Sequence, residues 1–80
     1  MKRFGIVNSD VITDPELSIQ AKGVYAIIST FADKNRSCFP SINTIADLAN
    51  VHPRTVSRKL KELSSKGYIK RKGRKIFILW

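Results

Sequence analysis

Positively charged side chains recur at helical spacing between residues 54 and 61 of this 80-residue chain. Arg54 and Arg58 stand four residues apart, and Lys61 follows three residues later. On a helix such positions share one face, because residues three and four apart lie about one turn apart. A guanidinium group is planar and presents several N–H donors, which suits it to phosphate and to the edge of guanine. The pattern therefore indicates binding to a polyanion.

The charge of the chain is concentrated at its C-terminal end. Residues 1–50 hold five cations and five carboxylates, whereas residues 51–80 hold ten cations and one carboxylate, Glu62. The formal net charge of +9 therefore belongs to residues 51–80. Because like charges at this density repel one another, they indicate a polyanionic partner, with nucleic acid favoured over an anionic membrane.

The sequence offers no catalytic or metal-binding constellation. His52 is the single histidine and Cys38 the single cysteine, which argues against a metal site built on cysteines and against an internal disulfide. No glycine-rich loop is present that would hold a nucleotide phosphate. We therefore expect no enzyme activity, no cofactor and no metal. No apolar run approaches the roughly 20 residues that a membrane span needs, so we expect a cytoplasmic, nucleoid-associated protein without a membrane partner.

Hydrophobic periodicity predicts three helices. The first begins near Ser18, and the second runs over 42–49 after Ser41, since serine hydroxyls can cap free N–H groups. The third begins at Pro53, a favoured first helical residue, and ends before Gly67. The apolar positions at helical spacing are Ala21, Val24, Tyr25, Ile28, Phe31 and Ala32 in the first helix, Ile42, Ile45, Ala46 and Ala49 in the second, and Val56, Leu60 and Leu63 in the third.

Short strands complete the predicted secondary structure. Residues 38–39 are expected to form a very short strand that ends at Pro40, because proline cannot donate a ladder hydrogen bond. Residues 68–71 and 75–80 flank a turn at Gly73, which predicts a β-hairpin. Residues 3–13 predict an arm with a short strand and a turn.

Only three residues, 50–52, separate the second and third helices. Asn50 tolerates the left-handed backbone that so sharp a corner needs, and Ala46 leaves room on its inner side. Val51 is expected to plug the corner, and Val56 to pack the third helix against the second. This spacing is typical of a helix-turn-helix.

The stretch FPSINTIADLANVHPRTVSRKLKELSSKGYIKRKGR resembles the winged helix-turn-helix domains of bacterial and phage DNA-binding proteins. The segment DPELSIQAKGVYAIISTFA is similar to the first helix of a subset found among regulators and replication initiators. Two positions depart from the family pattern: Asn50 stands where many relatives have glycine, and His52 stands where a serine or threonine cap is usual. The second departure predicts a weaker cap on the third helix.

The resemblance implies a mainly α fold with a small β-sheet, a winged helix. We expect one domain over residues 1–80, with an N-terminal arm at 1–14, the helix-turn-helix at 42–66 and the wing hairpin at 68–80. The third helix, 53–66, is expected to enter the major groove of DNA, with Arg54 and Arg58 contacting bases. The basic wing is expected to grip phosphates or enter an adjacent minor groove.

The candidate DNA-binding residues lie in three groups. The start of the second helix favours a backbone phosphate, the third helix faces the groove, and the hairpin holds the remaining cations. The residues are Ser41, Asn43, Thr44, His52, Arg54, Thr55, Ser57, Arg58, Lys61, Lys70, Arg71, Lys72, Arg74 and Lys75.

The function expected from these features is sequence-specific binding of double-stranded DNA by a transcription regulator. The alternatives are the DNA-binding domain of a plasmid or phage replication initiator and a protein-interaction winged helix. The last would need apolar side chains where Arg54, Arg58 and Lys61 stand. A-form RNA suits a single inserted helix less well than B-DNA does. The chain is also compatible with fusion to a further domain or with a homodimer, whose apolar seam would use Leu79 and Trp80 or Phe4, Ile6 and Val7.

Overall fold

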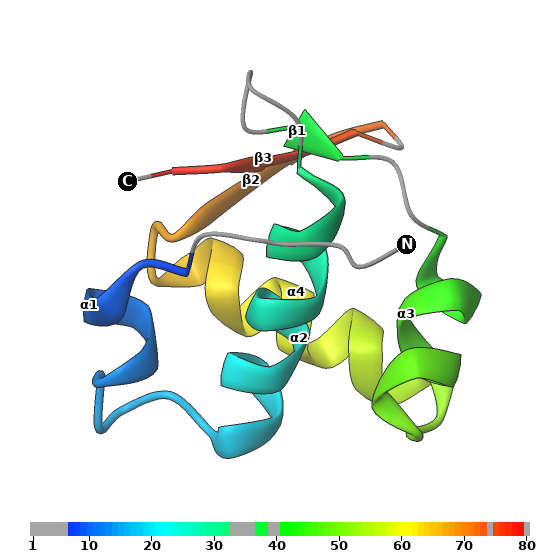
Figure 1. The fold of residues 1–80 in the computed structure, drawn as a ribbon, viewed down its shortest axis with the longest axis horizontal. Coiled ribbons are helices and arrows are strands. Elements are labelled where there is room, and N and C mark those ends of the chain that lie inside the picture. The colour runs from blue at the N-terminus through cyan, green and yellow to red at the C-terminus, as the bar shows by residue number, and fades with distance from the viewer. Residues whose placement is uncertain (1–6, 33–36, 39–40, 74, 80) are drawn as a thin grey trace.

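Three longer helices and a small sheet make up the part of the chain that the computed structural model describes, residues 7–32, 37–38, 41–73 and 75–79 (Figure 1). Some residues that carry predictions lie outside these ranges, namely the arm residues 1–6 and Phe39, Pro40, Arg74 and Trp80. The elements in chain order are α1 (Ser9–Ile12), α2 (Ile19–Phe31), β1 (Ser37–Cys38), α3 (Ile42–Ala49), α4 (Pro53–Ser65), β2 (Ile69–Lys72) and β3 (Lys75–Ile78).

The predicted helix starts are confirmed by the caps observed there. Ser18 Oγ accepts a hydrogen bond of 3.1 Å from the Ala21 amide at the start of α2. Ser41 Oγ accepts a bond of 3.0 Å from the Thr44 amide at the start of α3. Each serine thereby satisfies one of the amides that have no partner within the helix.

The corner between α3 and α4 takes the predicted left-handed form at Asn50, where φ is 56° and ψ is 46°. The Val51 amide donates to the Ala46 carbonyl at 3.0 Å, which closes the last turn of α3. Val51 packs partly buried against the core, while Ala46 is buried. The corner is therefore tight enough to hold α3 against α4.

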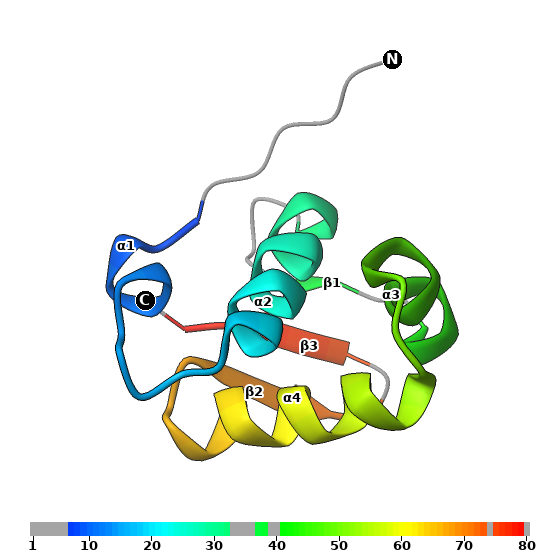
Figure 2. The same cartoon turned by 90° about the horizontal axis from the view of Figure 1, so that it is seen from below.

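The sheet has the order β1-β3-β2, and both strand pairs are antiparallel. Ile69 pairs with Ile78, and both are buried together with Ile76 on the side of the sheet that meets the helices. Gly73 has a φ of 60° in the hairpin turn, which matches the role predicted for it. This hairpin beside three packed helices confirms the winged-helix layout (Figure 2).

The core forms where α2, α3 and α4 meet the sheet. α2 packs against both α3 and α4, while α4 contacts β2 and α2 contacts β1. Val56, Leu60 and Leu63 of α4 have no exposed surface, as their spacing predicts. The other buried apolar residues are Val11, Leu17, Ala21, Val24, Tyr25, Ile28, Ile45, Ala46, Ile69, Ile76 and Ile78.

Within the arm predicted over residues 3–13, residues 9–12 form the short helix α1, which the sequence did not predict. Asn8 caps this helix through a 2.9 Å bond from the Asp10 amide, and Val11 is buried beneath it. Gly23 is exposed on α2, and a Cβ atom built at this position would meet nothing within 4 Å.

We expect Gly23→Ala to stabilise the protein by about 0.5–1 kcal/mol, because alanine lowers the backbone entropy cost within a helix and meets no neighbour here. Urea denaturation measures the change. The matched control is Gly67→Ala, which should destabilise by about 1 kcal/mol because its φ of 81° is strained for alanine. Destabilisation by both changes would contradict this account of α2.

Candidate nucleic-acid interface

The apolar and the cationic residues of α4 lie on opposite faces of the helix. Val56, Leu60 and Leu63 face α2, α3 and β2, so the residues between them are turned outward. Arg54, Arg58 and Lys61 are exposed on that outward face, as the sequence predicts. In the part of the chain that the structure describes, no ion pair engages these three side chains. The face is therefore a cationic surface without a carboxylate to neutralise it.

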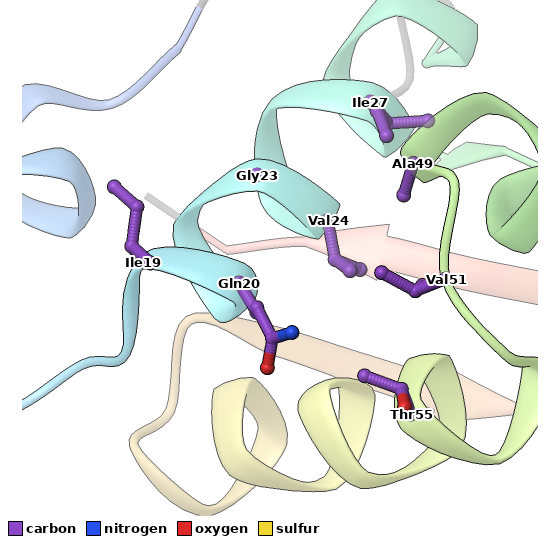
Figure 3. Close-up of a pocket in the computed structure, with 8 residues that line it drawn as sticks. All are labelled: Ile19, Gln20, Gly23, Val24, Ile27, Ala49, Val51 and Thr55. Carbon is purple, nitrogen blue, oxygen red and sulfur yellow. The ribbon is translucent and has the colours of Figure 1, made fainter.

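The edges of α4 hold residues that the sequence placed on the binding face. Thr55 and Ser57 are half-buried. Thr55 lines a groove of about 250 Å³ between α2 and the corner (Figure 3), so its side chain lies at the rim of the cationic face. The groove is lined by Ile19, Gln20, Gly23, Val24, Ile27, Ala49, Val51 and Thr55.

His52 caps α4 directly. Its Nδ1 accepts a hydrogen bond of 3.0 Å from the Arg54 amide, and Pro53 occupies the first helical position. This bond requires a neutral imidazole with the proton on Nε2, because a protonated Nδ1 has no lone pair to accept with. The sequence predicted a weaker cap at this position, and the structure places a specific acceptor there.

The start of α3 exposes Ser41, Asn43 and Thr44 together. The Ser41 hydroxyl already accepts from the Thr44 amide and lies 2.9 Å from the Thr44 hydroxyl. The remaining amides of the first turn and the positive end of the helix dipole favour an anion here. This end of α3 therefore has the properties of a phosphate contact.

The hairpin divides its cations between two faces. Side chains alternate along a strand, and Arg71 pairs with the buried Ile76, so Arg71 lies on the face that also meets the helices. Lys70 and Lys72 lie on the opposite face, and both are exposed. Lys75, opposite Lys72, is half-buried. The sequence analysis treated these cations as one group that would grip phosphates or enter an adjacent minor groove.

The sequence analysis did not predict a contact between Glu62 of α4 and Ser18 at the start of α2. Glu62 Oε2 accepts from the Ser18 amide at 2.9 Å, and Oε1 lies 3.2 Å from the Ser18 hydroxyl. Lys59 approaches the same carboxylate at 3.5 Å. These contacts, with the Ser18 amide contributing most, lower the pKa of Glu62. The signal available in the sequence was that Glu62 is the one carboxylate among ten cations in residues 51–80.

A second polar cluster joins the α1–α2 connection to the end of α4. The Tyr68 hydroxyl donates to Asp14 Oδ2 at 2.7 Å, and Lys66 Nζ lies 3.2 Å from the same oxygen. The Tyr68 hydrogen bond is the largest influence that lowers the pKa of Asp14. The cluster ties the N-terminal segment to the region where the hairpin begins.

Other kinds of site find no support in the described ranges. Among residues 7–32, 37–38, 41–73 and 75–79, no three histidine, cysteine or carboxylate side chains gather as metal ligands would. No helix in those ranges has the length and apolar character that crossing a membrane requires.

Comparison with known proteins finds a family whose match includes α2, α3 and α4. The family described as "Helix-turn-helix domain" matches residues 16–69, which is more than half of the chain. Neither a curated protein nor a solved structure matches the chain.

Replacing His52 tests its capping role. We expect His52→Ala to destabilise the protein by about 1 kcal/mol, because the Arg54 amide loses its acceptor. His52→Ser should retain most of the stability, since serine is a strong cap. Thermal unfolding of both variants measures the difference. Equal losses would indicate that the imidazole contributes something other than the cap.

Acid should weaken the fold through Glu62 and Asp14. A carboxyl whose folded pKa is lowered contributes stability above its unfolded pKa, and this contribution disappears as the pH falls through the folded value. We therefore expect the urea midpoint to decline from about pH 5 downward. Glu62→Gln should make that decline shallower, because it removes one of the two carboxyls whose pKa is lowered in the folded state. Identical pH profiles for Glu62→Gln and the unmodified protein would contradict the role given to this contact.

Proposed function

Because the chain belongs to the helix-turn-helix domain family, we propose that it binds double-stranded DNA sequence-specifically, with α4 in the major groove. The observation that carries this proposal is the outward face of α4, where Arg54, Arg58 and Lys61 are exposed above a fully buried apolar stripe. The major groove of B-DNA is about 12 Å wide and admits one α-helix.

The order of residues along α4 supports separate roles for its cations. Arg54 lies in the first turn and Arg58 one turn later, and the N-terminal part of a recognition helix reaches base edges. We assign base contacts to these two arginines. Lys61 lies farther along the helix and suits a backbone phosphate.

Contacts on either side of α4 support this orientation. The exposed start of α3 is suited to one phosphate, and Arg71 lies on the helix-facing side of the hairpin. Both would contact the backbone of the duplex that α4 enters, and these contacts would fix the position of the protein along the DNA. These contacts add affinity without selecting sequence.

The biological role that we propose is transcription regulation by residues 1–80 acting as one unit, with replication initiation as the alternative. Selection of bound sequences from a random duplex pool distinguishes the two. A palindromic site supports a dimeric regulator, because protein symmetry is mirrored in the site. Tandem direct repeats support an initiator. The absence of any enriched sequence would contradict sequence-specific binding.

The affinity for duplex DNA should depend steeply on salt. If about five phosphates are neutralised, the logarithm of the binding constant should fall with the logarithm of salt concentration with a slope of about −4 to −5. Fluorescence anisotropy of a labelled duplex across a salt series gives the slope. A slope near zero would exclude this cationic surface as the binding face.

Arg58→Ala should relax sequence preference by about 1–3 kcal/mol at one base position, because a bidentate contact to guanine is lost. The matched control is Lys59→Ala, which removes one positive charge from the side of α4 that carries Glu62. Because Lys59 also contacts Glu62, this control is judged on sequence preference alone, which it should leave unchanged while it weakens all duplexes alike. If both variants alter preference alike, Arg58 does not contact a base.

A further inference from the structure

The groove between α2 and the corner is an apolar surface that carries no charge (Figure 3). None of its eight lining residues is charged, although charged residues make up 26% of the chain. Most of the lining residues are aliphatic, and the groove has a volume of about 250 Å³. Because covering apolar surface lowers the free energy, a concave and uncharged groove of this kind is a candidate docking surface.

The same groove also holds a protruding side chain. Ile19 is 80% exposed and lies at one end of the groove, while Ala49 and Val51 lie at the other end (Figure 3). A single exposed apolar side chain is common on protein surfaces and needs no explanation by itself. Here the exposed isoleucine adjoins an apolar recess, so one patch supplies both a projection and a place to receive it. A two-fold symmetric dimer requires this combination, because the same patch must meet itself.

Three residues of α2 that line the groove are spaced four residues apart, namely Ile19, Gly23 and Ile27. Residues at this spacing form a ridge along a helix, and such a ridge packs into the grooves of a facing helix. Gly23 stands at the centre of the ridge. If two α2 helices cross at Gly23 about a two-fold axis, Ile19 of each copy meets the recess beside Ile27 of the other copy.

Packing within the described ranges does not account for a glycine at position 23. Glycine is less favourable than alanine inside a helix, and Gly23 lies within α2. A Cβ atom there would meet nothing within 4 Å, and Gly23 is not one of the glycines with a positive φ. The close approach of a second backbone does account for a glycine, because a side chain at this position would hold the two helices apart.

The charge of the chain favours a second copy as the occupant of the groove. Two copies that each carry a net charge of +9 repel one another wherever cations face cations. The groove offers a contact in which no like charges meet, whereas an acidic partner would be attracted to the outward face of α4. Arg54 and Arg58 do not line the groove, so pairing there leaves both available to a duplex. We propose that the groove is a self-association site, at which two copies pair about a two-fold axis near Gly23 with Ile19 of each copy seated in the groove of the other.

Sedimentation equilibrium of the free chain measures this pairing without DNA, so its result does not depend on the proposed function. Because the contact is limited to one groove, we expect a weak dimer with a Kd of about 10–100 µM. Ile19→Gln and Gly23→Gln should each raise that Kd by about tenfold or more, because the first removes the projection and the second holds the helices apart. The matched control is Leu48→Gln, which changes a side chain that is 59% exposed but does not line the groove. Its Kd should stay within about twofold of the original value.

Salt dependence and thermal unfolding show what kind of contact forms and whether the variants fold. Because the groove is uncharged while the two copies repel one another, raising the salt concentration from about 50 to about 500 mM should strengthen the pairing. Binding of the chain to a polyanion changes in the opposite direction. All three substituted positions are exposed, so thermal unfolding at a concentration below the Kd should show that each variant is folded.

Isotope-filtered NOE spectra of mixed ¹³C-labelled and unlabelled chains show which methyl groups meet across the pair. Contacts from Ile19 of one copy to Ile27 or Val51 of the other would support the proposal. A chain that stays monomeric up to about 1 mM, a Kd unchanged by Ile19→Gln or by Gly23→Gln, or an equal loss in Leu48→Gln would overturn it. Contacts between copies that are confined to Leu79 would also overturn it, because they would place the dimer seam at the C-terminal end.

Discussion

Burial of three residues of α4 determines what the rest of the molecule can do. Val56, Leu60 and Leu63 lose all of their exposed surface against α2, α3 and the sheet. Large apolar side chains each contribute about 1.5–3 kcal/mol when fully buried, so the helix cannot rotate without a large cost. The cations that alternate with them are therefore held on the outside, where a partner with negative charge can reach them. The charge of α4 is a surface property that depends on the packing beneath it.

The buried residues determine which face of α4 points inward, and two further contacts determine where the helix lies. The left-handed Asn50 directs the chain from α3 into α4 within three residues. Glu62 then binds the Ser18 amide at the start of α2, which joins parts of the chain 44 residues apart. A carboxylate near a helix N-terminus also interacts favourably with the helix dipole. Glu62 is the one acidic side chain in residues 51–80, and it binds the start of α2. The outer face of α4 therefore stays positive.

The sequence predicted the long elements because their signals are local. Apolar spacing located α2, α3 and α4, with serine caps marking the starts of α2 and α3 and Pro53 marking the start of α4. The tolerance of Asn50 for a left-handed backbone located the corner. α1 was missed because four residues are too few to show a helical period, and its form depends on the burial of Val11. The Glu62–Ser18 contact depends on tertiary packing. The division of the hairpin lysines was missed because a change of one residue in strand register reverses every face, and only the observed pairing of Lys72 with Lys75 settles it.

The most direct test of the outward face of α4 is a titration of the ¹⁵N-labelled protein with duplex DNA, followed by amide NMR shifts. We expect the largest shifts on residues 52–61 and at the start of α3, while the exposed part of α2 around Gly23 remains unchanged. Large shifts around Gly23 and the groove beside it, with residues 52–61 unchanged, would show that α4 does not contact the duplex. In that case the buried stripe of α4 would still hold the fold together, but its cations would not meet the duplex.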